Sequence, residues 1–207
     1  MSASAPGRTV VLATHNAGKL RELSQMLAPH GFRVLPVSDF AAEAPPETAS
    51  TFVENALIKA RAAAQASGHG AIADDSGLEV DALGGAPGVH SARYAGPQAG
   101  DADNVARLLS ALGDAPVASR SARFRCAAVF LAHPEHPAPL VCQAHWEGSI
   151  LEQPRGDGGF GYDPVFLDRA SGLSAAELPA EHKNRVSHRG QAVRALVAAL
   201  AAGGSGG

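Results

Sequence analysis

The chain has 207 residues, 45% of them apolar, which is enough to build the core of one sizeable domain over residues 1–207. A formal net charge of −3 argues against sequence-blind binding of nucleic acid, and Cys126 and Cys142 cannot form a disulfide framework or a four-ligand zinc site alone. No membrane-spanning run or signal-peptide core is recognisable. We therefore expect a cytoplasmic protein, with flexible ends at about 1–7 and 203–207.

The first predicted elements are a strand, a short polar loop and a helix. Residues 9–13 form an apolar, β-branched run, and apolar residues with helical spacing extend from Leu20 to Leu27. Between them lies Thr14-His15-Asn16-Ala17-Gly18-Lys19, which lacks the spacing of a Walker loop. Free N–H groups at a helix start, with polar side chains and a lysine, favour a phosphate site. The alternative is a capped helix with a surface lysine.

A second strand is predicted at residues 32–35. Residues 41–50 are rich in Ala, Pro, Glu and Thr, so we expect a loop. Glu43 and Glu47 are expected to be exposed on it.

The next helix has clear boundaries in the sequence. Residues 51–54 match a capping box, and the helix should end near Gly68. Asn55 and Lys59 are four residues apart and share one face of this helix. A solvated helix surface is the common explanation for such a pair.

Two adjacent carboxylates follow an apolar run in residues 71–78, where Asp74 and Asp75 precede Ser76 and Gly77. We expect them at a strand end, with one side chain directed into a cleft and the other holding a turn. Two like charges this close need a positive partner, and a divalent metal is a suitable one. An ordinary turn is the alternative, because Asp, Ser and Gly are common turn residues.

The middle of the chain alternates between strand and helix signals. Residues 78–83 alternate like a strand with one wet face, and the Gly- and Pro-rich residues 84–88 require a tight loop. Asp101 or Asp103 is expected to cap a helix that ends at Gly113.

Residues 123–132 and 140–146 are predicted to pair as a hairpin, and residues 149–151 could extend the same sheet. Strands and helices alternate early in the chain and then give way to this hairpin. The pattern predicts a mixed sheet with helices packed on it, which is α/β or α+β and not all-parallel.

A glycine-rich segment occupies residues 155–164. Its glycines permit unusual backbone angles and close approach of another group. Phe160 and Tyr162 offer flat aromatic faces and Asp163 offers an acceptor, a combination that suits stacking on a nucleobase. The alternative is a mobile loop whose aromatic side chains fold back onto the core.

Near the C-terminus, residues 174–177 are expected to cap a short helix ending before Pro179. Residues 181–190 form the densest cluster of cationic and polar side chains, ahead of an amphipathic helix marked by residues 193–200. Such a cluster is usually a solvated face. Beside an anion or a carbonyl-rich ligand it would be an array of hydrogen-bond donors.

Taken together, these motifs resemble the non-canonical purine nucleoside triphosphate pyrophosphatases, the inosine/xanthosine triphosphate pyrophosphatase family. The resemblance covers essentially the whole chain, because seven motifs follow one another in order. The motifs are Ala13-Thr14-His15-Asn16-Ala17-Gly18-Lys19, Thr51-Phe52-Val53-Glu54-Asn55-Ala56, Ala73-Asp74-Asp75-Ser76-Gly77-Leu78, Gly84-Gly85-Ala86-Pro87-Gly88, Ser91-Ala92-Arg93-Tyr94, Gly158-Gly159-Phe160-Gly161-Tyr162-Asp163-Pro164 and Ser187-His188-Arg189-Gly190.

The resemblance implies a Mg²⁺-dependent hydrolase that cuts inosine, deoxyinosine and xanthosine triphosphates (ITP, dITP and XTP) to the monophosphate and pyrophosphate. Such an enzyme removes deaminated purines from the nucleotide pool. The family fold is an elongated mixed sheet flanked by helices, with two lobes around a central cleft. Members are usually homodimers.

The resemblance also implies roles for individual residues. Asp75 would bind the metal and orient or deprotonate a water, Asp74 or Glu47 would complete the metal shell, and Ser76 would hydrogen-bond the nucleotide. The phosphate chain would be bound by Thr14, His15, Asn16, Ala17, Gly18, Lys19 and Lys59. The base would be bound by Phe160, Gly161, Tyr162, Asp163, Lys183, His188 and Arg189, with Phe160 stacking on the purine and the three cationic or imidazole side chains donating to its 6-keto oxygen.

Two positions depart from the family pattern. His15 replaces a glycine expected in many members, and Pro46 precedes Glu47 where relatives often have two adjacent carboxylates. Glu43 and Glu47 therefore both stay candidates for the metal.

Two other functions would use similar residues. One is a pyrophosphatase for modified pyrimidine nucleotides, and the other is a catalytically silent nucleotide-binding module. A substrate panel distinguishes the first, and magnesium-dependent turnover the second.

Overall fold

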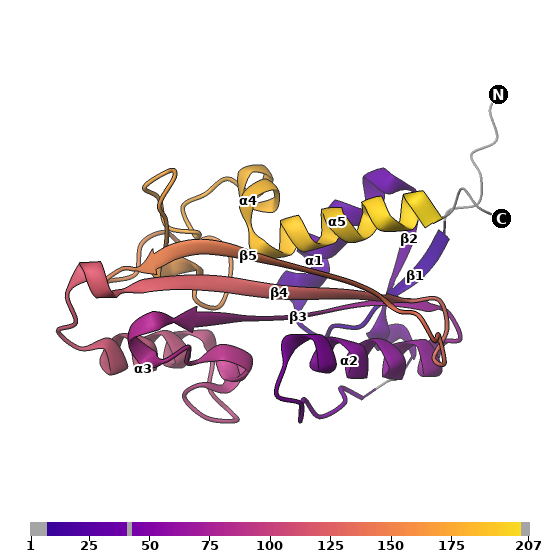
Figure 1. The fold of residues 1–207 in the computed structure, drawn as a ribbon, viewed down its shortest axis with the longest axis horizontal. Coiled ribbons are helices and arrows are strands. Elements are labelled where there is room, and N and C mark those ends of the chain that lie inside the picture. Colours follow the sequence, from indigo (N-terminus) through magenta and orange to yellow (C-terminus); the bar gives the residue numbers. More distant parts are fainter. Residues whose placement is uncertain (1–7, 41–42, 204–207) are drawn as a thin grey trace. The chain divides into compact units, whose positions relative to one another are not determined.

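The computed structural model describes residues 8–40 and 43–203, which form a mixed sheet with helices packed on it (Figure 1). The strand order is β2-β1-β3-β4-β5-β6. β1 is parallel to β2 and β3, whereas β5 and β6 are antiparallel, so the predicted mixed α/β fold is confirmed. The strands are β1 (Arg8–Leu12), β2 (Phe32–Pro36), β3 (Gly70–Val80), β4 (Ser121–Leu131), β5 (Leu140–Ile150) and β6 (Phe166–Asp168). The helices of the described part are α1 (Ala17–Leu27), α2 (Phe52–Ser67), α3 (Asp101–Leu112), α4 (Ala180–Val186) and α5 (His188–Gly203).

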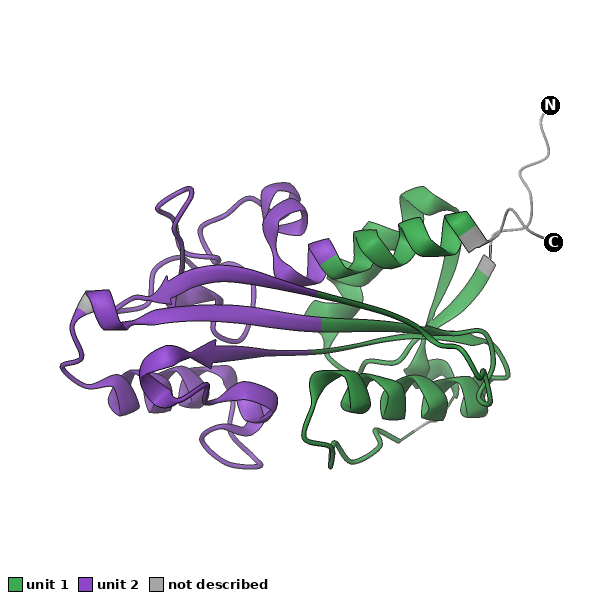
Figure 2. Ribbon diagram, viewed as in Figure 1, with its two compact units in different colours: residues 1–75, 127–143, 192–207 green, residues 76–126, 144–191 purple. Residues whose placement is uncertain are grey.

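The chain divides into two compact units (Figure 2). Unit 1 comprises residues 1–75, 127–143 and 192–207, and unit 2 comprises residues 76–126 and 144–191. β3, β4 and β5 contribute residues to both units. A single domain over the whole chain stays a prediction.

The predicted flexible ends lie outside the described residues, except that Gly203 is the last residue of α5. Within the described part, no helix has both the length and the apolar character that a membrane crossing requires.

In unit 1, α2 packs on the sheet through small side chains. Its predicted start is confirmed, because the Thr51 hydroxyl accepts from the Glu54 amide at 3.2 Å and donates to the Glu54 carboxylate at 2.7 Å. Gly68 ends the helix in a left-handed conformation. Alanines let a helix approach a sheet closely, so polar side chains on the same helix are brought near the strands. The packed residues are Ala56, Ala60, Ala63 and Ala64 of α2 against Val11, Ala13, Ala71 and Ala73.

In unit 2, the strands alternate between a buried and a solvent-exposed face. The strand predicted over residues 78–83 is confirmed only as far as Val80, because residues 81–83 form a short 3-10 helix. The inward-facing residues join α3 and the glycine-rich segment in one core. This core includes Leu78, Val80, Val105, Leu108, Ala122, Phe124, Trp146, Tyr162 and Phe166.

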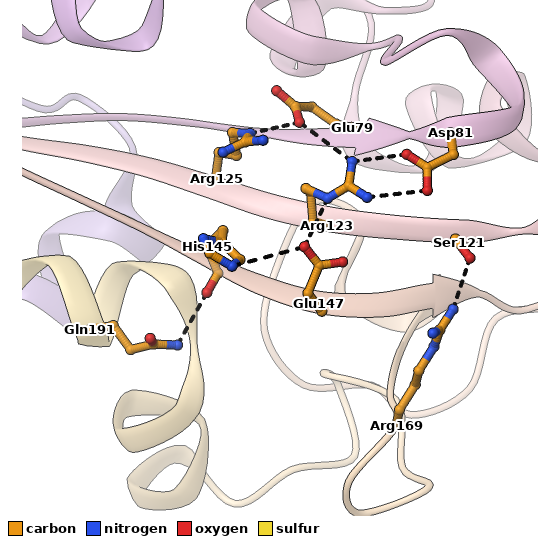
Figure 3. Close-up of polar contacts among 9 residues, drawn as sticks. All are labelled: Glu79, Asp81, Ser121, Arg123, Arg125, His145, Glu147, Arg169 and Gln191. Carbon is orange, nitrogen blue, oxygen red and sulfur yellow. Dashed lines mark hydrogen bonds and ion pairs between the residues drawn. The ribbon is translucent and has the colours of Figure 1, made fainter.

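Arg123 organises the wet face of these strands (Figure 3). Its guanidinium donates to both Asp81 carboxylate oxygens at 2.9 and 3.1 Å and to Glu147 at 2.8 Å. Arg125 donates to Glu79 at 2.6 Å. Hydrogen bonds to Asp81 and Glu147 raise the pKa of Arg123 above its ordinary value. The charged side chains on this face thus pair with one another.

Several predicted elements are corrected by the structure. Residues 174–177 form a turn and not a helix: the Ser174 amide donates to the Glu177 carboxylate at 2.7 Å, but Ser174 also bridges to Leu167 as extended chain. α4, which the sequence analysis missed, begins only after Pro179. Gly100, and neither aspartate, is the N-cap of α3.

Candidate active site

Asp74 and Asp75 do not end a strand, and no turn follows them. β3 continues through both residues to Val80, so the predicted turn is wrong. Because side chains alternate along a strand, the two carboxylates face opposite sides of the sheet. Asp75 shares the α2-facing side with Ala73, and Asp74 lies on the opposite side with Ile72. In unit 1, Figure 1 shows α1 and α2 on opposite sides of the sheet.

On the α2 side, Asp75 is buried between two donors. The Lys59 ammonium lies 2.6 Å from Asp75 Oδ1, and Asn55 Nδ2 donates to Oδ2 at 3.4 Å. The same ammonium lies 3.0 Å from Glu47 Oε1. Asn55 is fully buried and the Lys59 side chain is 12% exposed, so the solvated-surface explanation for this pair is wrong.

The structure separates the two candidate glutamates. Glu43 is exposed, as expected, whereas Glu47 is half-buried because its carboxylate turns toward Lys59. The prediction that Glu47 is exposed is therefore wrong. The Thr48 amide donates to the Pro46 carbonyl at 3.1 Å, which closes a tight turn around Glu47.

Burial and ion pairing act together on this group. Burial lowers the pKa of Lys59, but the Asp75, Asp74 and Glu47 carboxylates outweigh it, so that pKa is raised and the ammonium stays charged. Burial also raises the pKa of Asp75 by more than Lys59 lowers it. A raised pKa makes a carboxylate a better proton acceptor, and such shifts are common at active sites.

On the α1 side, Asp74 pairs with Lys19 at 3.1 Å. Asn16 caps α1 by accepting from the Lys19 amide at 3.0 Å, and the Asn16 amide donates to the Thr14 hydroxyl at 3.2 Å. The first turn contains no acidic residue, and its leading amides have no acceptor within the helix. His15 is exposed beside them. The predicted strand, loop and helix are confirmed, and they can receive an anion.

The side chains at and beside Asp75 are of the chemical type that binds a magnesium ion. Among the described residues, no three His, Cys, Asp or Glu side chains gather as a ready-made metal cage. Mg²⁺ does not need such a cage, because it usually keeps several waters and binds one or two carboxylates together with substrate phosphates. Asp75 and Glu47 meet this requirement, since both reach the single ammonium of Lys59.

In unit 2, two predicted cationic residues lie against one predicted aromatic ring. Lys183 Nζ lies 5.2 Å and the Arg189 guanidinium carbon 5.3 Å from the centre of the Phe160 ring. Both cations are buried. Arg189 also donates to the Ser76 hydroxyl at 3.5 Å. A flat face and two cationic donors are thus available at one place.

Asp163 fixes this cluster. Its Oδ2 accepts from Lys183 Nζ at 2.7 Å and from the Phe160 amide at 2.8 Å. Gly159 leaves the space for it, because a Cβ at this position would overlap the Asp163 carboxylate. The close approach of Asp163 explains why position 159 of the glycine-rich segment is a glycine.

The start of α5 positions His188 and Arg189. The Ser187 hydroxyl accepts from the Gly190 amide at 3.1 Å, which places both residues in the first turn of the helix. The His188 ring stacks on Phe124 with a centroid distance of 4.6 Å and an interplanar angle of 12°. Within the cationic cluster at residues 181–190, His188 and Arg189 are therefore buried and do not belong to a solvated face.

Tyr162 supports the site from the core. Its hydroxyl donates to the Ser91 carbonyl at 2.8 Å, and burial raises its pKa above the ordinary value. The Asp101 carboxylate accepts from the Gly161 amide at 2.6 Å. This contact spans sixty residues of sequence. No spacing pattern could have predicted it.

A buried carboxylate with a raised pKa beside a lysine, such as Asp75, is typical of an enzyme active site. Residues 10–199 match the family model described as the Ham1 family, and the chain belongs to this family. A Methylococcus capsulatus protein named dITP/XTP pyrophosphatase is 58% identical over 195 residues, which cover 94% of this chain and 97% of that protein. One from Escherichia coli O157:H7 with the same name is 52% identical, covering 92% and 97%.

Solved structures of proteins from this family also match the chain. The structure of a HAM1 protein from Coxiella burnetii has a TM-score of 0.85 and 46% identity, and the match covers 93% of this chain and 98% of that one. The family resemblance noted from the motifs is confirmed.

Replacing Gly159 by alanine is expected to destabilise the protein more than replacing Gly161. Both glycines have left-handed backbone angles, φ 74° and 61°, so either alanine adds strain of about 1–3 kcal/mol. Only at Gly159 would the new Cβ also displace Asp163, since no atom lies within 4 Å at Gly161. Urea unfolding of both variants measures the difference. Equal losses would contradict the assigned role of Gly159.

Proposed function

We propose that this protein hydrolyses the non-canonical purine nucleoside triphosphates ITP, dITP and XTP to the monophosphate and pyrophosphate, with Mg²⁺ as cofactor. Membership of the Ham1 family and relatives named dITP/XTP pyrophosphatase support the reaction. The observation that carries the proposal is the buried Asp75 carboxylate, held by Lys59 and Asn55 beside Glu47. A purely structural strand would have no use for this costly arrangement.

The triphosphate is assigned to unit 1. Thr14, Asn16 and the first-turn amides of α1 would bind phosphate oxygens, as anions bind at helix starts. Lys19 and Lys59 would supply positive charge. Both lysines already contact carboxylates, so they are oriented before the substrate arrives.

Asp75 is assigned the role of general base. It would take a proton from a water whose oxygen attacks the α-phosphorus, and the bond from that phosphorus to the bridging oxygen would break. Pyrophosphate then leaves with the electron pair. Lys59 and Asn55 hold the Asp75 carboxylate in position for this role.

Bound Mg²⁺ would neutralise phosphate charge and favour departure of pyrophosphate. Asp75 and Glu47 would hold it. Glu47 is a better candidate than Glu43, because it shares Lys59 with Asp75. Asp74 is a weaker candidate, because it faces the other side of the sheet and pairs with Lys19.

The base is assigned to unit 2. Phe160 would stack on the purine, Lys183, His188 and Arg189 would donate to its 6-keto oxygen, and Ser76 would hydrogen-bond the nucleotide. Gly161, Tyr162 and Asp163 would shape the pocket. Adenine carries a 6-amino donor at this position, so buried donors would be left unpaired, which disfavours it strongly. A homodimer and a cytoplasmic location stay predictions.

The proposed reaction is tested by product analysis. With ITP and Mg²⁺, we expect inosine monophosphate and pyrophosphate in equal amounts. Asp75→Asn should lower turnover on the order of 10²–10⁴-fold, because the base is lost, while ITP binding measured by calorimetry changes little. The exposed Asp39→Asn is the matched control and should be fully active. Orthophosphate as the product, a preference for pyrimidine nucleotides, or no turnover at all would each contradict the proposal.

Arg189→Ala should change substrate preference. We expect kcat/KM for ITP to fall on the order of 10–100-fold, because a charged hydrogen bond to the 6-keto oxygen is lost, and that for adenosine triphosphate to fall much less. Arg185→Ala, on the exposed side of α4, removes the same charge and should leave both values unchanged. Equal losses on the two substrates would place Arg189 in phosphate binding or structure instead.

A further inference from the structure

One buried side chain of the acidic site contacts Asp75 but takes no part in the chemical steps proposed above. Asn55 on α2 is fully buried and uses both ends of its amide. Its Oδ1 accepts from the Ala49 amide at 3.0 Å, and its Nδ2 donates to the Ala49 carbonyl and to Asp75 Oδ2, each at 3.4 Å. The residue therefore joins the loop that carries Glu47 to the Asp75 carboxylate.

Asn55 and Lys59 connect the same two parts of unit 1. They lie one helical turn apart on α2. Lys59 links Glu47 to Asp75 Oδ1 through its ammonium, while Asn55 links Ala49 to Asp75 Oδ2 through its amide. Each carboxylate oxygen of Asp75 thus faces one donor. Two donors on different oxygens fix both the position and the plane of a carboxylate.

The two connections respond differently to a bound substrate. Lys59 is a cation on a flexible stem, so an incoming phosphate competes with Asp75 and Glu47 for its ammonium. Asn55 is neutral, short and fully buried, so a phosphate has no charge to attract there. The contacts of Asn55 can persist while those of Lys59 exchange.

We propose that Asn55 is a positioning residue that keeps Asp75 and the loop carrying Glu47 in a fixed position relative to each other, as metal binding and water activation require. The inference rests on the proposed function. Supporting side chains of this kind typically change metal affinity or activity 10- to 100-fold when they are removed.

The chain contains a matched control. Asn104 on α3 is buried and holds a loop in the same manner: its Oδ1 accepts from the Ala95 amide at 2.8 Å, and its Nδ2 donates to the Ala92 carbonyl at 3.2 Å. Neither of these two contacts involves a carboxylate. Loss of either asparagine removes a loop contact, but only loss of Asn55 also releases Asp75.

The test compares Asn55→Ala with Asn104→Ala. Both should lower the free energy of unfolding in urea. Only Asn55→Ala should lower kcat for ITP, on the order of 10–100-fold, and it should weaken binding of Mn²⁺ alone, measured by electron paramagnetic resonance, to a similar extent. KM for ITP should change little in either variant. Hydrogen exchange at the Ala49 amide should accelerate only in Asn55→Ala.

Asn55→Asp provides a second variant if the alanine protein does not fold. It keeps the acceptor for the Ala49 amide but replaces the donor to Asp75 by a repelling carboxylate. We expect slow exchange at Ala49 together with reduced kcat. A kcat and a Mn²⁺ affinity like those of Asn104→Ala would overturn the role of Asn55. If the wild-type protein fails to cleave ITP, the proposed function fails, but the Mn²⁺ and exchange measurements still decide the role of Asn55.

Discussion

The site in unit 1 depends on the burial of two adjacent carboxylates in the middle of one strand. Strand geometry sends Asp74 and Asp75 to opposite faces, so each carboxylate makes its direct ion pair on its own side of the sheet. Each therefore needs its own partner, and a different helix supplies each one: Lys19 from α1 and Lys59 from α2. Removing one partner of a buried pair costs about 3–5 kcal/mol, so the sheet and both helices must form together.

This balance of charge also explains how the site could accept a highly charged substrate. In the free protein the buried Asp74 and Asp75 carboxylates are each paired with one lysine. In the reaction proposed above, a triphosphate with Mg²⁺ would bring both an anion for the lysines and a cation for the carboxylates, so every buried charge would keep a partner after the exchange. Unit 2 contains a different kind of site, in which Asp163 pairs with Lys183 and holds it against the ring of Phe160.

Local patterns predicted the elements well and the long-range contacts poorly. The strand at residues 9–13 and the capping box at 51–54 are confirmed because their signals lie within a few residues of sequence. Residues 74–77 have the composition of a turn, but β3 pairs with β1 just before them and continues as strand, so sheet context overrides the local preference. The family motifs located most of the candidate residues. They gave no indication that Asn55 is buried against Asp75 or that Asp101 holds Gly161, because both contacts depend on the folded chain.

The assignment of one lysine to each face can be measured directly by urea unfolding without metal or nucleotide. Lys59→Met should lower the free energy of unfolding by about 3 kcal/mol, because Asp75 is left buried without its cation. Adding Asp75→Asn should restore most of that loss, whereas adding Asp74→Asn should restore much less. Equal rescue by the two asparagine substitutions would contradict the division of the aspartates between the two faces of the sheet.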